Sequence, residues 1–148
     1  MNFLGDARVQ MVAVADPVSD LPNYGYKGEL RGGRLVGQKK IEEFYAQQTK
    51  GGKFSGCRVY EDFRVMLDKE DLDAVYIATP DHWHCAAAVI AAGKGKHIYG
   101  QKPLAVTVEE GRRIADAVQA AGVTWQTGSQ QRSSAFFRTA CEYVRNGR

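Results

Sequence analysis

The stretch Ala74-Val75-Tyr76-Ile77-Ala78, followed at once by Thr79-Pro80, decides the fold of this chain. Five consecutive residues without a charge, two of them β-branched and one aromatic, predict a β-strand. A strand that is apolar along its whole length is typical of a parallel sheet covered on both faces. Thr79-Pro80 ends it, so the sequence places a sheet strand at residues 74–78 and a turn directly after it.

Strand-like runs recur on both sides of this stretch. Val9–Ala15 predicts an earlier strand that stops at Asp16-Pro17, and a short run at residues 57–60 predicts another. His97-Ile98-Tyr99 and residues 123–126 predict two later strands. The intervening segments have helical spacing, so strands and helices alternate. This alternation predicts an α/β domain with a doubly wound, Rossmann-like parallel sheet.

The predicted helices are recognised from apolar residues three and four apart. One of them opens at Thr107, whose spacing to Glu110 fits a capping box, and closes at Gly122. Another runs from His84 to Ala92 with Gly93 as its expected C-cap. The remaining helices lie at residues 38–50, near 63–67 and at 134–145, the last with Phe136, Phe137, Ala140, Tyr143 and Val144 expected to face inward.

Composition narrows the class of protein. The chain has 148 residues, 44% hydrophobic and 25% charged, with a net charge of +3. These values fit a soluble globular domain, and no run approaches the roughly 20 apolar residues of a membrane span. Three widely spaced cysteines favour reduced thiols over a disulfide framework. With no export signal at residues 1–6, a cytoplasmic location is favoured, although such a signal could precede Met1.

Residues 27–58 form a basic, glycine-rich segment. They hold eight Lys and Arg residues against three Glu, which predicts a mobile surface loop on either side of one helix. Nucleic-acid binding through this segment is the alternative. Because the whole chain carries only +3, a solvated loop is favoured, and no nucleic-acid partner is expected.

The residues after each predicted strand are the candidates for ligand binding, because the crevice of an open parallel sheet lies beyond the carboxyl ends of its strands. Asp16 follows the first strand. A carboxylate there can accept hydrogen bonds from both adenosine ribose hydroxyls and would repel a 2′-phosphate, which favours NAD over NADP. The alternative is that an Asp before a proline is only a turn residue.

Thr79 and Pro80 follow the central strand, and the stiffened turn could bring backbone and Trp83 against a planar ligand. His82, His84 and Cys85 invite a metal interpretation, but zinc patterns need further spaced ligand pairs, so no metal site is predicted.

Two later strands also end in polar side chains. Lys102 follows the strand at residues 97–99, where an ammonium could hydrogen-bond a substrate hydroxyl or a ribose and assist proton transfer. Gln130 and Arg132 follow the last strand and suit a polyol or a phosphate. Solvated side chains on ordinary exposed loops are the alternative for all three.

Taken together, Ala78-Thr79-Pro80-Asp81-His82-Trp83-His84, Gly100-Gln101-Lys102-Pro103-Leu104 and Gly128–Arg132 resemble the N-terminal domain of the glucose-fructose oxidoreductase/inositol dehydrogenase (Gfo/Idh/MocA) family. The resemblance covers nearly the whole chain. It implies a nucleotide-binding Rossmann domain followed by an α+β domain for substrate contacts and subunit interfaces. It also implies oxidation or reduction of a sugar or cyclitol hydroxyl with a nicotinamide cofactor.

The resemblance further implies roles for single residues. Asp16 corresponds to the ribose-binding acid, Thr79 and Pro80 to the turn against the dinucleotide, and Trp83 and His84 to neighbours of the cofactor. Lys102 corresponds to the motif lysine near the nicotinamide. The family motif there is usually Glu-Lys-Pro, whereas this chain has Gln101, so a carboxylate beside the lysine is missing.

Two departures from the family concern the ends of the chain: the beginning of the family's domain is missing, and Arg148 stands where the family crosses into its second domain. The first strand and its Gly-x-Gly-x-x-Gly turn, which holds the pyrophosphate, are absent from the sequence. In the order 3-2-1-4-5-6 that strand lies between the strands at residues 9–15 and 74–78, so a gap is expected there. We therefore expect residues 1–148 to be a partial NAD(P)-binding Rossmann domain without its C-terminal substrate domain, unless another segment or a second copy fills the gap.

Two functions of different classes follow. The first is a piece of an NAD-dependent oxidoreductase, with NADP the less favoured cofactor, that is inactive by itself. The second is a non-catalytic binding or oligomerisation module that keeps the α/β scaffold and forms a homo-oligomer through the open centre of the sheet.

Overall fold

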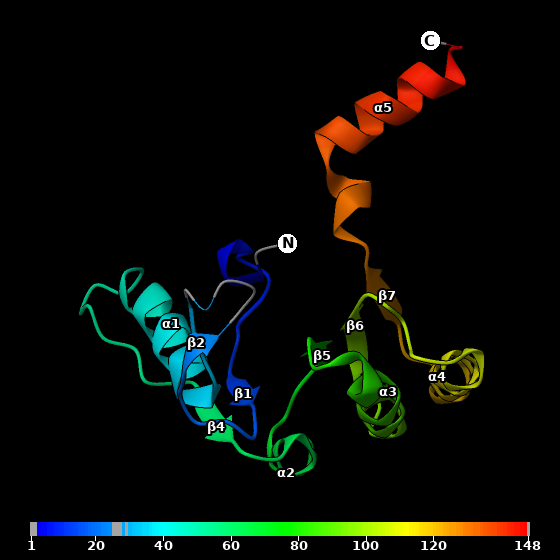
Figure 1. Cartoon of the computed structure of the whole chain (residues 1–148). Helices are drawn as coiled ribbons and strands as arrows, with labels where there is room; N and C mark the ends of the chain where they lie inside the picture. The colour runs from blue at the N-terminus through cyan, green and yellow to red at the C-terminus, as the bar shows by residue number, and fades with distance from the viewer. Residues whose placement is uncertain (1–2, 25–27, 29, 148) are drawn as a thin grey trace. The chain divides into compact units, whose positions relative to one another are not determined.

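The computed structural model describes residues 3–24, 28 and 30–147 (Figure 1). The chain divides into two compact units, Met1–Asp71 and Leu72–Arg148. Each unit has its own sheet and its own helices.

The first unit is built on a two-stranded parallel sheet. Strand β1 (Ala13–Ala15) pairs with β4 (Arg58–Tyr60), with Val14 opposite Val59. The helices α1 (Arg34–Ala46) and α2 (Phe63–Lys69) accompany the two strands, and a short 3₁₀ turn, η1 (Phe3–Gly5), comes before them. The buried apolar residues of this unit are Ile41, Cys57 and Leu67.

An antiparallel hairpin lies between β1 and α1, where the sequence predicts only a loop. It consists of β2 (Leu21–Tyr24) and β3 (Leu30–Gly32). Gly33 follows it with a φ of 111°, and a Cβ built on it would stand 2.6 Å from the carbonyl oxygen of Ser19. Only glycine fits at this close approach, which lets the chain turn from the hairpin into α1.

A polar cluster joins α2 to β4. Glu70, the residue that follows α2, is 5% exposed, and its carboxylate accepts a hydrogen bond from the Tyr60 hydroxyl. The Arg58 guanidinium lies 2.6 Å from the other carboxylate oxygen. The Tyr60 hydroxyl, followed by Arg58, keeps the pKa of Glu70 below its ordinary value. The buried carboxylate is therefore ionised and paired, which satisfies its charge.

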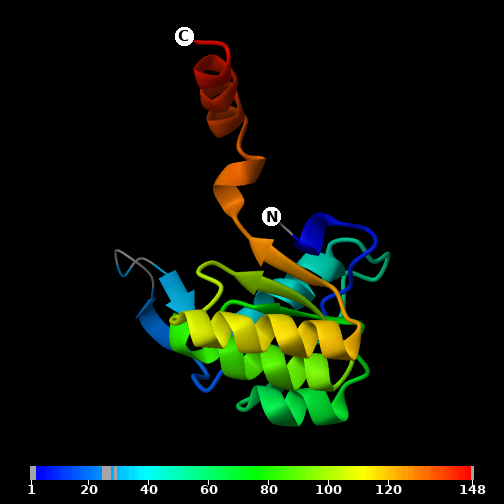
Figure 2. The ribbon, with the colours of Figure 1, turned by 90° about the vertical axis from the view of Figure 1, so that its right-hand side faces the viewer.

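The second unit is a three-stranded parallel sheet in the order β5 (Ala74–Ile77), β6 (His97–Gln101), β7 (Trp125–Gly128). Helices α3 (His84–Gly93) and α4 (Val108–Ala121) run side by side against one face of it (Figure 2). The core between helices and sheet contains mostly small and β-branched side chains: Ile77, Ala87, Ala88, Ala91, Ala92, Ile98 and Ile114.

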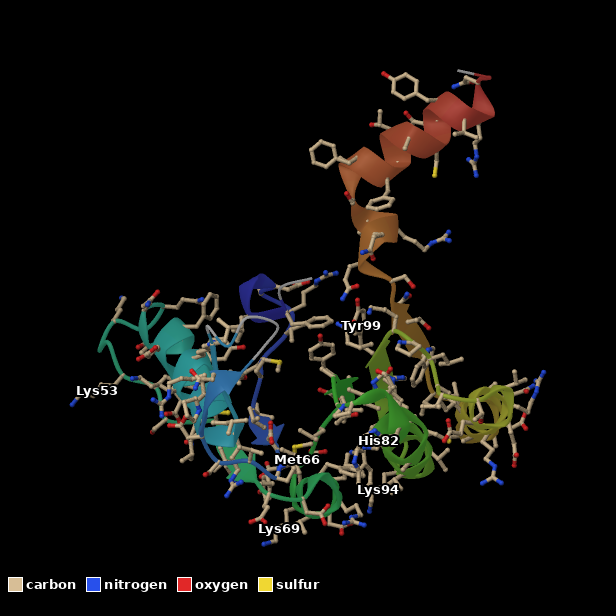
Figure 3. The ribbon with its side chains drawn as sticks, in the orientation of Figure 1. Lys53, Met66, Lys69, His82, Lys94 and Tyr99 are labelled. Carbon is tan, nitrogen blue, oxygen red and sulfur yellow. The ribbon has the colours of Figure 1, made fainter. Side chains whose placement is uncertain are left out.

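The other face of this sheet carries two tyrosines. Tyr76 and Tyr99 are opposite each other in the β5–β6 register, and their ring centroids are 5.5 Å apart. Figure 3 shows Tyr99 on the side of the sheet away from α3. Because side chains alternate along a strand, Ile98 then faces the helices while Tyr99 does not.

Gly100 in β6 makes room for the Trp125 ring of β7. A Cβ built on Gly100 would stand 2.4 Å from Cη2 of Trp125. That separation is far below van der Waals contact, so any side chain at this position would displace the indole. The central strand of this unit therefore needs glycine for packing, although its φ is ordinary.

The predicted α/β, Rossmann-like fold is confirmed. Among the described residues β1 pairs only with β4 and β5 only with β6, so β1 and β5 belong to separate sheets. The capping box of Thr107 and Glu110 is present, and Gly122 ends α4 in the left-handed conformation. Across the described residues, no helix combines the length and the apolar character of a membrane span.

Two local predictions are wrong. Gly93 is the last residue of α3 and not its cap, since Lys94 takes the cap position and Gly95 adopts the positive φ of 71°. Helix α5 (Ala135–Arg145) forms as predicted, but its apolar residues do not face a core. Phe136 is 88% exposed and Val144 is 76% exposed.

Candidate functional site

Three loops meet at one edge of the second unit. β5, β6 and β7 are parallel, so the residues that follow them lie beyond the same ends of the strands. The loops contain Thr79-Pro80, Lys102-Pro103 and the 3₁₀ turn η3 (Gln130–Ser133), respectively. This carboxyl edge is where the sequence predicts the ligand crevice.

His84 joins the first two of these loops. The ring Nδ1 lies 2.7 Å from the carbonyl oxygen of Pro103, and Nε2 lies 2.9 Å from the carbonyl oxygen of Thr79. The residue is 2% exposed and begins α3, directly after the 3₁₀ turn η2 (Asp81–Trp83). Each ring nitrogen therefore faces a backbone carbonyl, and every protonated nitrogen donates to the carbonyl that it faces.

Gln101 joins the second and third loops. Its Nε2 donates to the Tyr76 hydroxyl of β5, and its Oε1 accepts a hydrogen bond of 3.0 Å from Nε2 of Gln130. A glutamate at position 101 could accept the Gln130 bond but could not donate to Tyr76 unless protonated. The glutamine at this position thus extends a hydrogen-bonded line across all three strands.

The remaining predicted residues of this unit stand at the surface. Trp83 is 43% exposed, and its backbone N–H donates to the carbonyl oxygen of Pro80 at 2.9 Å. Lys102 and Arg132 are exposed, and neither side chain makes a hydrogen bond or salt bridge with any residue the structure describes. An indole and two cationic groups are thus available to a ligand at the carboxyl edge.

Asp16 belongs to the first unit, at the carboxyl end of β1. Its backbone N–H donates to the carbonyl oxygen of Tyr60 at 3.0 Å, which continues the β1–β4 pairing. Its carboxylate Oδ1 accepts a hydrogen bond of 2.8 Å from the Val18 N–H. The half-buried side chain is thus held in a turn, as the turn-residue interpretation of an Asp before proline predicts. Its other carboxylate oxygen accepts no hydrogen bond from the described residues and can accept one from a hydroxyl group.

Arg34 holds the loop that contains Asp16. Its Nη1 donates to the carbonyl oxygens of Asp16 and Pro17 at 3.0 and 2.9 Å. The first N–H groups of α1, those of Arg34 and Leu35, donate to the carbonyls of Val18 and Ser19. Two of the first N–H groups of α1 are therefore already bonded to the loop.

The structure brings together Thr79, Pro80, His84 and Lys102 through the His84 ring, and Gln130 through Gln101. Asp16 belongs to the other unit. Sequence reasoning placed Tyr76 in a strand without a role in the site, and it considered Arg34 only as part of the basic segment at residues 27–58. It also missed the burial of His84, although residues three, four, seven and eight positions later in α3 are the buried alanines of that helix.

These groups fit the parts of a dinucleotide that their chemistry recognises. The Asp16 carboxylate is an acceptor for ribose hydroxyls, and the carboxyl edge of the second unit offers amides, an ammonium and an indole for a ribose or a planar ring. The sequence holds no Gly-x-Gly-x-x-Gly turn for a pyrophosphate. Parallel strands with polar groups at their carboxyl ends are the arrangement in which open α/β domains bind their ligands.

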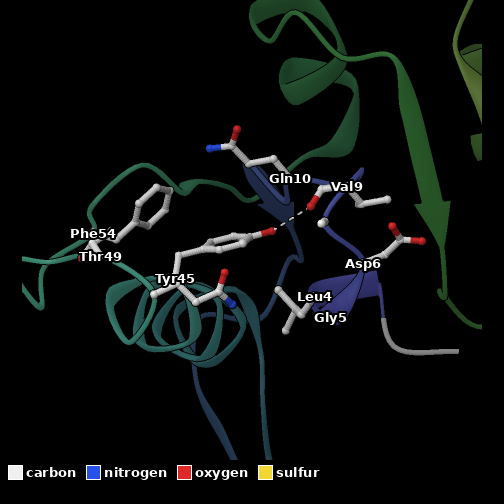
Figure 4. Close-up of a pocket in the computed structure, with 10 residues that line it drawn as sticks. Leu4, Gly5, Asp6, Val9, Gln10, Tyr45, Thr49 and Phe54 are labelled. Atoms are coloured by element: carbon white, nitrogen blue, oxygen red, sulfur yellow. Dashed lines mark hydrogen bonds between the residues drawn. The ribbon is translucent and has the colours of Figure 1, made fainter.

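The structure also contains two pockets. The first, of about 380 Å³, is lined by residues 4–10 and by the end of α1 with the loop that follows it, and it lies before β1 (Figure 4). Tyr45 forms one wall, and its hydroxyl accepts from the Met11 N–H at 2.8 Å and faces the Val9 carbonyl. Asp16 is at the opposite end of β1, so this pocket is separate from the carboxyl end of the strand.

The second pocket, of about 560 Å³, is a groove between α3 and α4 that includes Cys85, Val89 and Arg113. Within the described part of the chain, no group of three or more His, Cys, Asp or Glu residues is placed to hold a metal ion.

Comparison with known proteins identifies the family. The family model described as "Oxidoreductase family, NAD-binding Rossmann fold" (GFO_IDH_MocA) matches residues 30–129. The chain belongs to this family, and its domain is of the NAD-binding type. The resemblance deduced from the three motifs is thereby confirmed.

Curated relatives include dehydrogenases, a reductase and, over 38% of this chain, glycosidases such as the alpha-N-acetylgalactosaminidase of Shewanella oneidensis. The chain is 37% identical to levoglucosan dehydrogenase of Pseudarthrobacter phenanthrenivorans over 58% of its own length and 22% of that protein. It is 32% identical to 1-carboxy-3-chloro-3,4-dihydroxycyclohexa-1,5-diene dehydrogenase of Comamonas testosteroni over 82% of its length and 24% of the relative. The chain thus spans about a quarter of the length of these relatives.

Solved structures agree with the fold. A levoglucosan dehydrogenase in complex with NADH and levoglucosan superposes with a TM-score of 0.54 at 36% identity, covering 61% of this chain and 24% of that one. The apo scyllo-inositol dehydrogenase of Lactobacillus casei has a TM-score of 0.65 at 23% identity, covering 93% of this chain and 33% of the other. The second likeness shows the fold alone.

Proposed function

We propose that this chain supplies the cofactor-binding part of an NAD-dependent oxidoreductase that acts on a hydroxyl of a sugar or cyclitol by hydride transfer. One observation carries the proposal: the loops after β5, β6 and β7 are tied together at one edge, with Lys102 exposed among them. Relatives named for levoglucosan and 1,5-anhydro-D-fructose, both sugar derivatives, support the substrate class.

In this proposal each residue has a role. Asp16 accepts the adenosine ribose hydroxyls, and Thr79, Pro80 and Trp83 form the turn against the cofactor. Lys102 hydrogen-bonds the reacting hydroxyl or the nicotinamide ribose and assists proton transfer, while a hydride passes between the substrate carbon and the nicotinamide. Gln130 and Arg132 bind hydroxyls of the substrate. In this proposal the chain is part of a longer enzyme. That enzyme has a substrate domain, which supplies the remaining substrate contacts, and it forms a homo-oligomer.

The cofactor role is tested by titrating the chain with NADH and NADPH and following energy transfer from tryptophan to the bound cofactor. We expect saturable binding with NADH preferred. Asp16→Asn keeps an acceptor for the Val18 N–H but removes the charge, so it should reduce the preference for NADH over NADPH by roughly tenfold. Asp71→Asn, which removes the same charge at an exposed position of the first unit, is the control. An unchanged preference in Asp16→Asn would remove Asp16 from the site.

A cytoplasmic location is a further part of the proposal. Its support is that Cys57, Cys85 and Cys141 are all free. Fractionation of cells that produce the protein, with a thiol-reactive tag to report the redox state of the cysteines, tests it. Recovery of disulfide-linked protein outside the cytoplasm would contradict it.

A second function is favoured by the free edge of β5. This strand is apolar, yet among the described residues it pairs only with β6, and an apolar strand at a sheet edge is a site for strand addition. A non-catalytic module that oligomerises through this edge would sediment as a dimer and would not bind NADH. Sedimentation velocity with and without NADH separates the two functions.

A further inference from the structure

The position of His84 differs from that of the other histidines. His82 and His97 are exposed, whereas His84 is 2% exposed and has a backbone carbonyl within hydrogen-bond distance of each ring nitrogen. Both carbonyls belong to loops at the carboxyl edge, one after β5 and one after β6. A single rigid ring therefore links two segments that are 24 residues apart, from Thr79 to Pro103.

The number of hydrogen bonds that the ring donates depends on how many of its nitrogens carry a proton. A neutral ring donates one hydrogen bond, to Thr79 or to Pro103, and a ring with protons on both nitrogens donates to both. In every case the nitrogens point at protein carbonyls and not at solvent. His84 consequently has no nitrogen left for a bound cofactor, and it differs in this respect from the direct neighbour that the family resemblance implies.

Lys102 is the group whose placement depends on this link. Its side chain is exposed and makes no hydrogen bond or salt bridge with the described residues, so only its backbone fixes where the ammonium can reach. The neighbouring carbonyl, that of Pro103, is the one held by His84 at 2.7 Å. Loss of the ring would free the Lys102-Pro103 loop from the Thr79-Pro80 turn.

We propose that His84 is a positioning residue that fixes Lys102 relative to the Thr79-Pro80 turn, and that it acts on cofactor binding through Lys102 and not by contact. This inference rests on the proposed function for the role of Lys102 at the nicotinamide end of the site. The link between the two loops is independent of that function. The two parts can therefore fail separately in the experiment below.

The first measurement is amide hydrogen exchange in the chain without cofactor. His84→Leu fills the space without hydrogen bonds, and His84→Gln keeps an amide that can donate to a carbonyl. We expect faster exchange at residues 78–82 and 100–106 in His84→Leu, with protection partly restored in His84→Gln. His97→Gln is the matched control, because it removes an imidazole that accepts from the Thr124 N–H at the other end of β6. Unchanged exchange in both His84 variants would overturn the proposal.

The second measurement is a double-mutant cycle on NADH affinity, with Lys102→Met as the second site. We expect His84→Gln and Lys102→Met each to weaken NADH binding, by roughly tenfold or less, and the double variant to bind as Lys102→Met alone. ADP, which lacks both the nicotinamide and its ribose, should bind all of them equally. Additive losses, or equal losses for ADP, would show a general structural role and contradict positioning through Lys102.

Failure of the proposed function gives a different pattern. If the parent chain binds neither NADH nor ADP, the cofactor role is contradicted, while the exchange experiment still decides whether His84 holds the two loops. If His84→Leu does not fold by circular dichroism, His84→Gln alone decides both measurements.

Discussion

Each of the two units is stabilised internally by a different kind of interaction. In Leu72–Arg148 the buried set consists of alanines and isoleucines with one histidine, and a tryptophan ring lies against the backbone of Gly100. In Met1–Asp71 fewer apolar residues are buried, and polar links join the elements instead, such as the Glu70 carboxylate with Tyr60 and Arg58. The second unit should therefore be sensitive to side-chain volume, and the first to charge and pH.

The largest effect is expected from Gly100→Ala. The added Cβ would stand 2.4 Å from the Trp125 ring, so the indole must move, at a cost on the order of 3 kcal/mol. Both tryptophans, Trp83 and Trp125, are in the second unit, so urea denaturation followed by tryptophan fluorescence reports it directly. Gly93→Ala is the control, because no atom lies within 4 Å of its Cβ and alanine favours a helix. Equal midpoints for the two variants would contradict the packing argument.

Glu70→Ala should have the next largest effect, this time on the first unit. It leaves the Tyr60 hydroxyl and the Arg58 guanidinium without their shared acceptor, at a cost on the order of 2 kcal/mol. The measurement is hydrogen exchange of the β4 amides. Because the pKa of Glu70 is lowered in the fold, its contribution is present above the unfolded pKa of roughly 4.3 and is lost as the pH falls through the folded value. Glu43→Ala, an exposed glutamate near Lys39, should change little.

Thr107→Ala should cost about 1 kcal/mol in the second unit, because it removes the hydroxyl that accepts from the Glu110 N–H at the start of α4. The same urea titration measures it. Thr107→Ser retains the hydroxyl and should behave as the parent. A loss in Thr107→Ser as large as in Thr107→Ala would mean that the methyl group, and not the cap, is responsible.

The smallest effect concerns Cys57. Burial raises the pKa of this thiol to about 11, so the folded unit keeps a proton that the unfolded chain loses near pH 8.5. Stability of the first unit should therefore be full below that pH and should fall as the pH rises toward 11, and Cys57→Ala should abolish the fall. Amide hydrogens exchange with water very rapidly between pH 8 and 11, so the loss of stability is better measured by circular dichroism in urea.

Patterns local in the sequence were predictable. The apolar run at residues 74–77, the Thr107 capping box and Gly122 each express their structure within a few residues, because strand burial and helix capping are short-range. The hairpin of β2 and β3 was missed, since Pro22 and the positive φ of Asn23 make residues 21–24 unlike a regular strand. The helical spacing of apolar residues predicted the apolar face of α5, but such spacing does not indicate what the face contacts.

The candidate site was predictable only in part. Strand ends are readable from the sequence, so the apolar runs alone place Asp16, Thr79 and Lys102 at the carboxyl ends of strands. The two carbonyls around His84 come from loops far apart in the chain, and only the three-dimensional fold brings them to one ring. The spacing of His84 from Ala87, Ala88 and Ala91 does indicate its buried side, and this signal could have separated it from the exposed His82.

The anchoring of Arg34 has a consequence for engineering a change of cofactor. A phosphate on the adenosine ribose needs a guanidinium or ammonium that is free to turn toward it. Arg34 is committed to the carbonyls of Asp16 and Pro17, and Arg31 is paired with Asp20. If Asp16 binds the adenosine ribose as proposed, replacing it alone would remove a repulsion without supplying an attraction, and a switch to NADP would need a new cation placed on the hairpin.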